Sequence, residues 1–140
     1  MKNNTQSGFS LIELLLVVTI LGIVTAIGIP SFQKGIRAAD NGAAFATLRS
    51  ISTTQVSYFS QNGRFARLSE LNTIHANGLG TLSGDSLIRG RFVFEMSPLV
   101  PTDAELKDGY EIVASGTNGV AGTPYVFRVT QSGEIIPVTP

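Results

Sequence analysis

One carboxylate, Glu13, stands near the start of a long apolar run, where a charged side chain is unexpected. The segment Phe9–Ile29 has 21 residues, and Glu13 is its only charge. A carboxylate near a membrane span is unfavourable and persists only with a partner. The start of a helix supplies a partial positive charge, which stabilises a nearby carboxylate by a few tenths to about 1 kcal/mol. A full positive charge would stabilise it more.

Such a charge would appear if the chain were cut after Gly8. The new α-amine of Phe9 would then lie four residues before Glu13. That spacing is about one helical turn, so both groups would share one face of the helix. Cleavage between Gly8 and Phe9 would therefore turn an unfavourable carboxylate into half of an ion pair.

The apolar run is long enough to cross a membrane. At about 1.5 Å per residue, a helix over Phe9–Ile29 would span roughly 31 Å, close to the thickness of a hydrocarbon core. Three other interpretations stay open: a buried core helix, a plain single-pass anchor, and a conventional signal peptide cleaved at a small-residue site that ends at Gly28. A buried core helix is usually shorter and amphipathic, whereas this run is apolar on every face. A plain anchor leaves Glu13 unexplained, and a signal peptide would be discarded together with Glu13.

Composition limits the class of protein. The chain has 140 residues, which is room for about one domain. Ten basic and ten acidic residues balance each other, so the net charge does not favour a bulk nucleic-acid partner. The absence of cysteine excludes a disulfide framework and a thiolate metal site. No nucleophile–base pair, metal cluster or cofactor motif stands out, so we expect no enzyme and no cofactor.

The hexapeptide Gly8-Phe9-Ser10-Leu11-Ile12-Glu13, followed by an apolar run and then by Pro30, closely resembles the N-terminus of type IV prepilins and type II secretion pseudopilins. The resemblance implies an α+β fold, in which a long N-terminal helix packs on a small antiparallel β-sheet head. It divides the chain into a leader peptide (1–8), a transmembrane and filament-core helix (9–29), an amphipathic helix half (30–62) and a globular head (63–140).

The resemblance also implies a life cycle. A prepilin peptidase would cut after Gly8 and methylate the amine of Phe9. The precursor would cross the inner membrane once, with its N-terminus in the cytoplasm. Assembly machinery in that membrane would then build a helical homopolymer, a fimbrium, that extends to the periplasm, the outer surface or beyond. In this filament Glu13 would face the Phe9 amine of a neighbouring subunit. Pairing removes the penalty of several kcal/mol that each buried, unpaired ion would carry.

The sequence therefore predicts a structural subunit of a type IV pilus-like filament. A pseudopilin that drives protein export through a type II secretion system is the first alternative. A DNA-uptake pilin, with Arg89, Arg91 and Arg128 as a small basic patch on the sheet, is the second, although phosphate binding usually needs more positive charge.

The helix is expected to continue beyond the apolar run as far as about Gln61. Gly28 and Pro30 should soften it, because glycine weakens a helical turn and proline removes a backbone donor. Asn62-Gly63 is a typical stop signal. A helix of about 50 residues would be roughly 75 Å long. One face should be apolar, with Phe32, Ile36, Ala39, Ala43, Ala44, Leu48, Ile51 and Tyr58 on it.

Beyond Arg64 the composition changes to that of a small β-sheet domain. Residues 64–90 are expected to form a surface connection with one short helical patch at Leu68–Leu71, and His75 within it is expected to be a solvated side chain without a role. Alternating strands are expected over 89–97, 109–116 and 124–138, the last divided by a turn at 131–133. They predict an antiparallel meander that packs on the second half of the long helix.

Two loops remain as candidates for specificity. Asp103, Glu105 and Asp108 could supply oxygen ligands for calcium, a weak candidate because the loop lacks the EF-hand pattern. Major pseudopilins carry a calcium site in a loop near the C-terminus, which is what the resemblance adds here. The glycine-rich segment Gly116–Pro124 is expected to be an exposed hairpin tip.

Overall fold

One helix dominates the chain. The computed structural model describes residues 8–116 and 125–138, so the expected leader (1–8, except for Gly8) and most of the glycine-rich segment lie outside the described residues. Helix α1 spans Leu11–Asn62, 52 residues, and runs through Pro30 without a break. The prediction of a helix of about 50 residues is confirmed. The chain divides into two compact units, Met1–Ala38 and Ala39–Pro140, which are described separately.

The first unit is the bare N-terminal part of α1. Every large apolar side chain from Phe9 to Phe32 is between 47 and 80 % exposed. The hydroxyl groups of Thr19 and Thr25 donate to the carbonyl oxygens of Leu15 and Leu21, so these polar groups are satisfied within the helix itself. By length and composition α1 is long and apolar enough to cross a membrane. Its apolar surface therefore needs a cover that this chain does not provide in the described residues.

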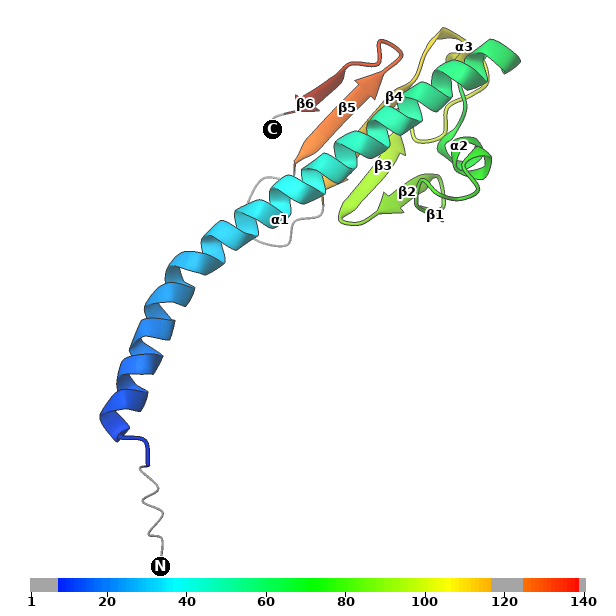
Figure 1. Cartoon of the computed structure of the whole chain (residues 1–140). Helices are drawn as coiled ribbons and strands as arrows, with labels where there is room; N and C mark the ends of the chain where they lie inside the picture. Colours follow the sequence, from blue (N-terminus) through cyan, green and yellow to red (C-terminus); the bar gives the residue numbers. More distant parts are fainter. Residues whose placement is uncertain (1–7, 117–124, 139–140) are drawn as a thin grey trace, which may run out of the picture. The chain divides into compact units, whose positions relative to one another are not determined.

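The second unit holds a six-stranded antiparallel sheet in the simple order β1-β2-β3-β4-β5-β6. The order confirms a meander and the α+β class (Figure 1). Two short helices, α2 (Leu68–Ile74) and α3 (Glu105–Asp108), lie in the connections. The strands are β1 (Thr81–Ser83), β2 (Ser86–Arg89), β3 (Phe92–Met96), β4 (Glu111–Gly116), β5 (Val126–Thr130) and β6 (Ile135–Val138).

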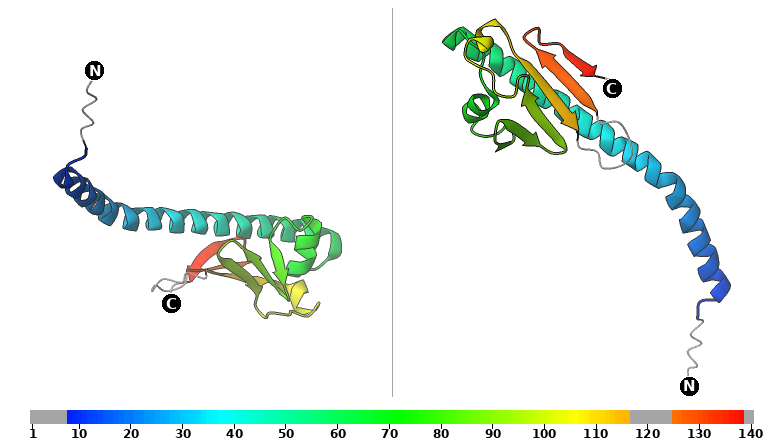
Figure 2. Two further views of the ribbon diagram at one scale, coloured as in Figure 1. Left: turned by 90° about the horizontal axis from the view of Figure 1, so that it is seen from below. Right: turned by 180° about the vertical axis from the view of Figure 1, so that it is seen from behind.

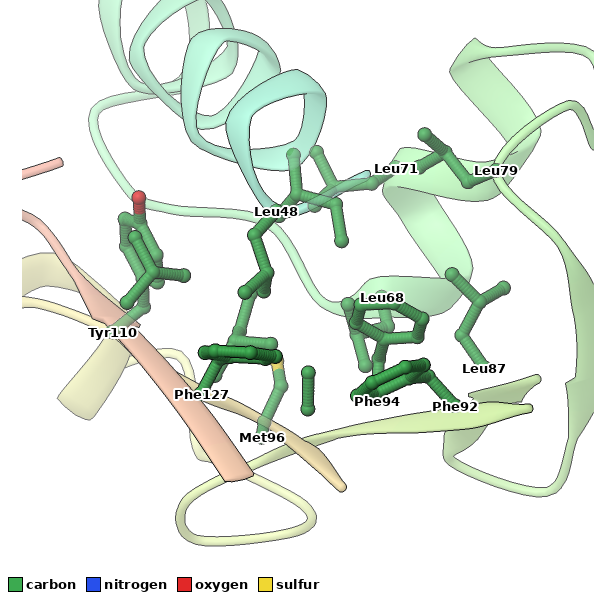
Figure 3. Close-up of a cluster of buried hydrophobic side chains, with 14 of the residues drawn as sticks. Leu48, Leu68, Leu71, Leu79, Leu87, Phe92, Phe94, Met96, Tyr110 and Phe127 are labelled. Atoms are coloured by element: carbon green, nitrogen blue, oxygen red, sulfur yellow. The ribbon is translucent and has the colours of Figure 1, made fainter. Parts of the chain in front are cut away.

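The core forms between this sheet and the second half of α1, which lies along one face of the sheet (Figure 2). The alternation predicted for β3 is confirmed, because Phe92 and Phe94 are buried while Glu95 is exposed. Leu48 of α1 lies above Phe94 and Phe127 of the sheet (Figure 3). Burial of several such side chains, at roughly 1.5–3 kcal/mol each, gives the head its own source of stability.

Two strands were missed by the sequence analysis, which treated residues 64–90 as a surface connection. β1 and β2 are short and carry little alternation, so their pattern is weak. Their turns contain Gly84 and Gly90, with φ of 62° and 60°, the conformation that two-residue hairpin turns require. The pairing of Leu87 with Phe94 then attaches this hairpin to β3 and buries Leu87.

The expected apolar face of α1 is only partly correct. Ala44, Leu48 and Ile51 are buried as predicted, and Tyr58 is partly buried against the core. Phe32 is 72 % exposed, and Ala39 and Ala43 are exposed as well. The spacing identified a helical face correctly, but the sheet covers only its later part.

Candidate functional site

The expected processing site lies just before the first turn of α1. Gly8, Phe9 and Ser10 precede the helix and are exposed, with Phe9 80 % exposed. A Cβ added to Gly8 would meet no atom within 4 Å. A peptidase would therefore meet no obstacle from the described residues at the bond between Gly8 and Phe9.

Glu13 folds back on the start of its own helix. The backbone N–H of Ser10 donates to Oε2 of Glu13 at 3.0 Å. The backbone N–H groups of Glu13 and Leu14 donate to the carbonyl oxygen of Ser10 at 3.1 and 3.2 Å, which begins the helix. This is the carboxylate half of a capping box, in which a residue at the third helical position accepts from the backbone of the capping residue. In the single chain Glu13 thus has a hydrogen-bond donor as its partner.

This role of Ser10 was not predicted from the sequence. The signal was present, because Ser10-Leu11-Ile12-Glu13 before an apolar run matches the S-x-x-E pattern of a capping box. The bond also brings the Glu13 carboxylate to the backbone nitrogen that directly follows Phe9. Any α-amine formed at Phe9 would be created in the immediate neighbourhood of that carboxylate.

Gly28 and Pro30, the residues expected to soften the helix, lie inside α1. A Cβ added to Gly28 would meet no atom within 4 Å, so its missing side chain makes room on an open surface. Pro30 has no N–H, and so the carbonyl oxygen of Ala26 loses its usual helical donor. Softening of this turn stays a prediction.

The three acidic residues considered for calcium are not gathered into one group. Asp103 Oδ1 accepts from Arg67 Nη2 at 2.6 Å. Glu105 Oε2 accepts from the backbone N–H and the hydroxyl of Thr102, both at 2.7 Å, and these bonds lower the pKa of Glu105. Across residues 8–116 and 125–138, no group of three or more histidine, cysteine, aspartate or glutamate side chains could hold a metal ion.

The three arginines considered for DNA are each engaged within the head. Arg91 Nη1 lies 3.5 Å from Asp40 Oδ2, and Arg128 Nη1 lies 3.8 Å from Glu111 Oε2. Arg89 donates to the carbonyl oxygens of residues 78 and 79, both at 3.3 Å. Two of the three positive charges therefore already have a carboxylate beside them.

A polar cluster that the sequence did not reveal joins the end of α1 to α2. Arg64 holds both carboxylate oxygens of Glu70, with Nη1–Oε2 at 2.9 Å and Nη2–Oε1 at 2.6 Å. These bonds lower the pKa of Glu70 to about 2. The Arg64 guanidinium also lies 5.4 Å from the centre of the Tyr58 ring. The cluster fixes the connection between helix and head.

His75 is exposed, as expected, but it also makes one contact that the sequence did not predict. Its Nε2 lies 2.6 Å from Oγ1 of Thr54, although the ring remains exposed. The Thr54 hydroxyl also donates to the carbonyl oxygen of Ser50. The histidine therefore attaches the end of α2 to α1.

A family model described as the prokaryotic N-terminal methylation motif matches residues 3–29. The type IV major pilin protein PilA of Myxococcus xanthus (strain DK1622) is 41 % identical over 46 % of this chain and 29 % of its own length. A fimbrial protein of Moraxella nonliquefaciens is 46 % identical over 44 % of the chain and 39 % of its own. The type IV major pilin protein PilE1 of Neisseria gonorrhoeae is 29 % identical over 84 % of the chain and 62 % of its own.

The matched region thus spans less than two thirds of each of these relatives. No solved structure gives a match.

Proposed function

We propose that this chain is a structural subunit of a type IV pilus-like filament, because residues 3–29 match the prokaryotic N-terminal methylation motif and similar proteins are type IV major pilins. The precursor is stored in the inner membrane through the apolar part of α1. It is cleaved after Gly8, methylated on the Phe9 amine, and assembled with other copies through its helices. Prepilin peptidase and the membrane-bound assembly machinery are its partners.

The observation that carries this proposal is that all large apolar side chains in the first part of α1 are exposed. From Phe9 to Phe32 no large apolar side chain is less than 47 % exposed. Lipid chains can cover such a surface in the membrane, and the helices of other copies can cover it in a filament. The head needs neither lipid nor other copies to cover its core, because α1 and the sheet bury that core between them.

We assign to Glu13 a role in the transfer of the subunit from the membrane into the filament. In the single chain its carboxylate accepts from the Ser10 N–H at 3.0 Å, which gives it one hydrogen bond but no countercharge. Cleavage after Gly8 adds a positive charge at Phe9, one residue away from that donor. In an assembled filament the carboxylate exchanges or shares this bond with the amine of a neighbouring copy. The pair leaves neither ion isolated in an apolar core and fixes the axial register.

The first test is the intact mass and N-terminal sequence of the mature protein from its native host. We expect a chain that begins at Phe9 and is heavier by one methyl group. A chain that begins at Ile29 would identify a conventional signal peptide, and retention of Met1 would leave only a membrane anchor. Either result would contradict the proposal.

The second test follows the assembly step itself. Cells that produce the protein should shed or display thin filaments that contain it, as detected by electron microscopy with an antibody against the head. Loss of prepilin peptidase should abolish these filaments and leave full-length precursor in the membrane. Filaments that persist without the peptidase would contradict the processing step.

A further inference from the structure

The face of the sheet that points away from α1, called here the outer sheet face, has a regular pattern of side chains. Strand pairing places five residues of five neighbouring strands in one row across it, here the apolar row. Four of its five members are valine or isoleucine. The row consists of Ile88, Val93, Ser115, Val126 and Val138.

A second row, the charged row, lies two residues further along the strands, about 7 Å away. Here Glu95 of β3 pairs with Val113 of β4, and Val113 pairs with Arg128 of β5. Ile136 of β6 continues the row beside Arg128. Opposite charges therefore stand one strand to either side of the central Val113.

In the described part of the chain, the outer sheet face leaves several apolar side chains exposed beside its charged ones. Among the described residues, Ile88, Ile136 and Val138 are 40, 41 and 39 % exposed, and the central valines are half-buried. α1 lies on the opposite face (Figure 2). Apolar side chains that gather on one exposed surface often mark a contact with another molecule.

The arrangement of both rows is symmetric about β4. A twofold axis parallel to β4, placed between two sheets that face each other, exchanges β3 with β5 and β2 with β6. It sets Glu95 of one copy against Arg128 of the other, twice. In the apolar row it sets Val93 against Val126 and Ile88 against Val138. The surface is therefore complementary to itself in charge and in apolar character.

We propose that the outer sheet face is a contact between two copies of this chain, and that it joins the heads of neighbouring filaments side by side. The inference rests on the proposed function for its setting, because filaments present many copies of the face at once. An isologous contact of this kind uses each head once, on the face away from α1. It adds a lateral association to the head-to-tail contacts that build a helical filament.

The state of Arg128 favours this pairing. Its only carboxylate neighbour among the described residues is Glu111, at 3.8 Å, a distance too long for a hydrogen bond. Its Nε–H is buried and has no hydrogen-bond partner in the described part of the chain, whereas the side chain as a whole is 43 % exposed and can present its terminal nitrogens to another molecule. Glu95 accepts one hydrogen bond, from the hydroxyl of Ser86 at 2.9 Å. Each side chain of the intermolecular pair thus keeps capacity for a further partner.

The charge of Glu111 opposes the pairing of two copies, and this provides a specific test of the proposed contact. It lies on β4, close to the proposed axis, so that two copies would bring their Glu111 side chains towards each other. Like charges in that position weaken the contact. Removal of the charge at Glu111 should therefore strengthen the association, whereas a residue with a merely structural role would not have this effect.

The test uses purified filaments of the full chain and measures the fraction that sediments as bundles at low speed, with electron micrographs of the same samples. Glu95→Arg and Arg128→Glu should each lower the bundled fraction by roughly fivefold, and the double reversal should restore most of it. Glu111→Gln should raise the bundled fraction. Lys107→Glu, a reversal of an exposed charge in α3, is the matched control and should change nothing.

High-speed sedimentation measures the total filament yield and keeps the two proposals apart. Absence of filaments from the native chain would overturn the proposed function. Normal filaments that do not bundle, or single reversals that bundle as well as the native chain, would overturn the inference. A double reversal as poor as the single ones, with the melting temperature of the head unchanged, would overturn it too. Val126→Thr adds a variant without a charge change, and it should also reduce bundling.

Discussion

Leu15 and Leu48 are the same residue type in the same helix, yet their exposure to solvent is very different. Leu15 is 56 % exposed, whereas Leu48 is completely buried against the sheet. The first unit has apolar side chains on all sides and no partner for them among the described residues. The second unit has fewer apolar side chains on α1, but the buried ones belong to one hydrophobic core together with residues of the sheet. Helix formation is thus common to both, and the source of their stability differs.

The comparison shows which partners cover the apolar side chains of each unit. The head is complete within one chain, because Phe94 and Phe127 meet Leu48 there (Figure 3). No described residue of this chain covers the N-terminal part of α1, and under the proposed function lipid or other copies cover it. Changes in the head should therefore appear in unfolding of the isolated protein, and changes near the N-terminus should appear only in assembly.

The largest effect is expected from removing the charge of Glu13. Both Glu13→Ala and Glu13→Gln should lower filament yield by about tenfold or more, since an unpaired buried ammonium is penalised by several kcal/mol. Membrane insertion should stay intact or improve. Quantification of sheared filaments against membrane-bound protein measures both quantities.

Glutamine is the informative variant of this pair. It can still accept the hydrogen bond from Ser10 that begins the helix, but it cannot neutralise the amine of a neighbouring Phe9. Normal filament yield from Glu13→Gln would show that capping, and not ion pairing, is the role of this residue. Normal membrane levels of the protein are the necessary control.

The next effect separates the two leucines. Leu48→Ala should lower the free energy of unfolding of the head by about 2–5 kcal/mol, because it deletes buried methyl groups and leaves a cavity. Leu15→Ala, which deletes the same atoms, should leave it unchanged within about 0.5 kcal/mol. Denaturant titration of the full chain in detergent, followed by tyrosine fluorescence of the head, measures both. Equal losses for the two variants would contradict the division into two units.

A smaller effect is expected from acid. Arg64 lowers the pKa of Glu70 to about 2, below the value near 4.3 of an unfolded chain. The native state therefore binds this proton less readily than the unfolded state, and the ion pair contributes stability above about pH 4.5. That contribution should be lost as the pH falls from about 4.5 to 2. The melting temperature of the head across this range checks the prediction.

Glu70→Gln provides the matched variant for the acid experiment. It should be less stable than the native chain at pH 6, and the difference should shrink towards pH 2 as the native carboxylate becomes protonated. A difference that stays constant between pH 6 and pH 2 would show that the charge of Glu70 does not matter. The part of α1 before Ala39 should not affect this result.

The smallest effect is expected from calcium. Asp103 already binds Arg67, and Glu105 already accepts two bonds from Thr102. Addition of calcium or of a chelator should therefore shift the melting temperature of the head by less than about 1 °C. A rise of several degrees with calcium, abolished in Asp103→Asn, would revive the site and would favour the secretion alternative.

Much of the fold could be predicted from local patterns. The apolar run, the helical spacing and the alternation of Phe92 and Phe94 are periodic, and periodicity follows from backbone geometry alone. β1 and β2 were missed, although Gly84 and Gly90 stand where two-residue turns would need them. These short strands have weak patterns of their own, and pairing with β3 stabilises them.

The residues of the candidate site also fall into two groups, those that local sequence identifies and those that only the tertiary structure brings together. Gly8, Phe9 and Glu13 could be identified because cleavage chemistry and the spacing of one helical turn are local properties. The hydrogen bond from Ser10 to Glu13 was equally local and was overlooked. By contrast, the partner of Arg64, the contact of His75 with Thr54 and the engagement of Asp103 by Arg67 join residues that the sequence alone does not pair.

The sequence by itself determined the long helix, the cleavage motif and the alternating strands, because each depends on neighbours within a few residues. Only the tertiary structure decided which part of the apolar helix the sheet covers and which part stays open. It also decided that Glu95 and Arg128 stand symmetrically about β4. Such relations depend on the register of strands that are distant in the chain, and that register is set by packing over the whole domain.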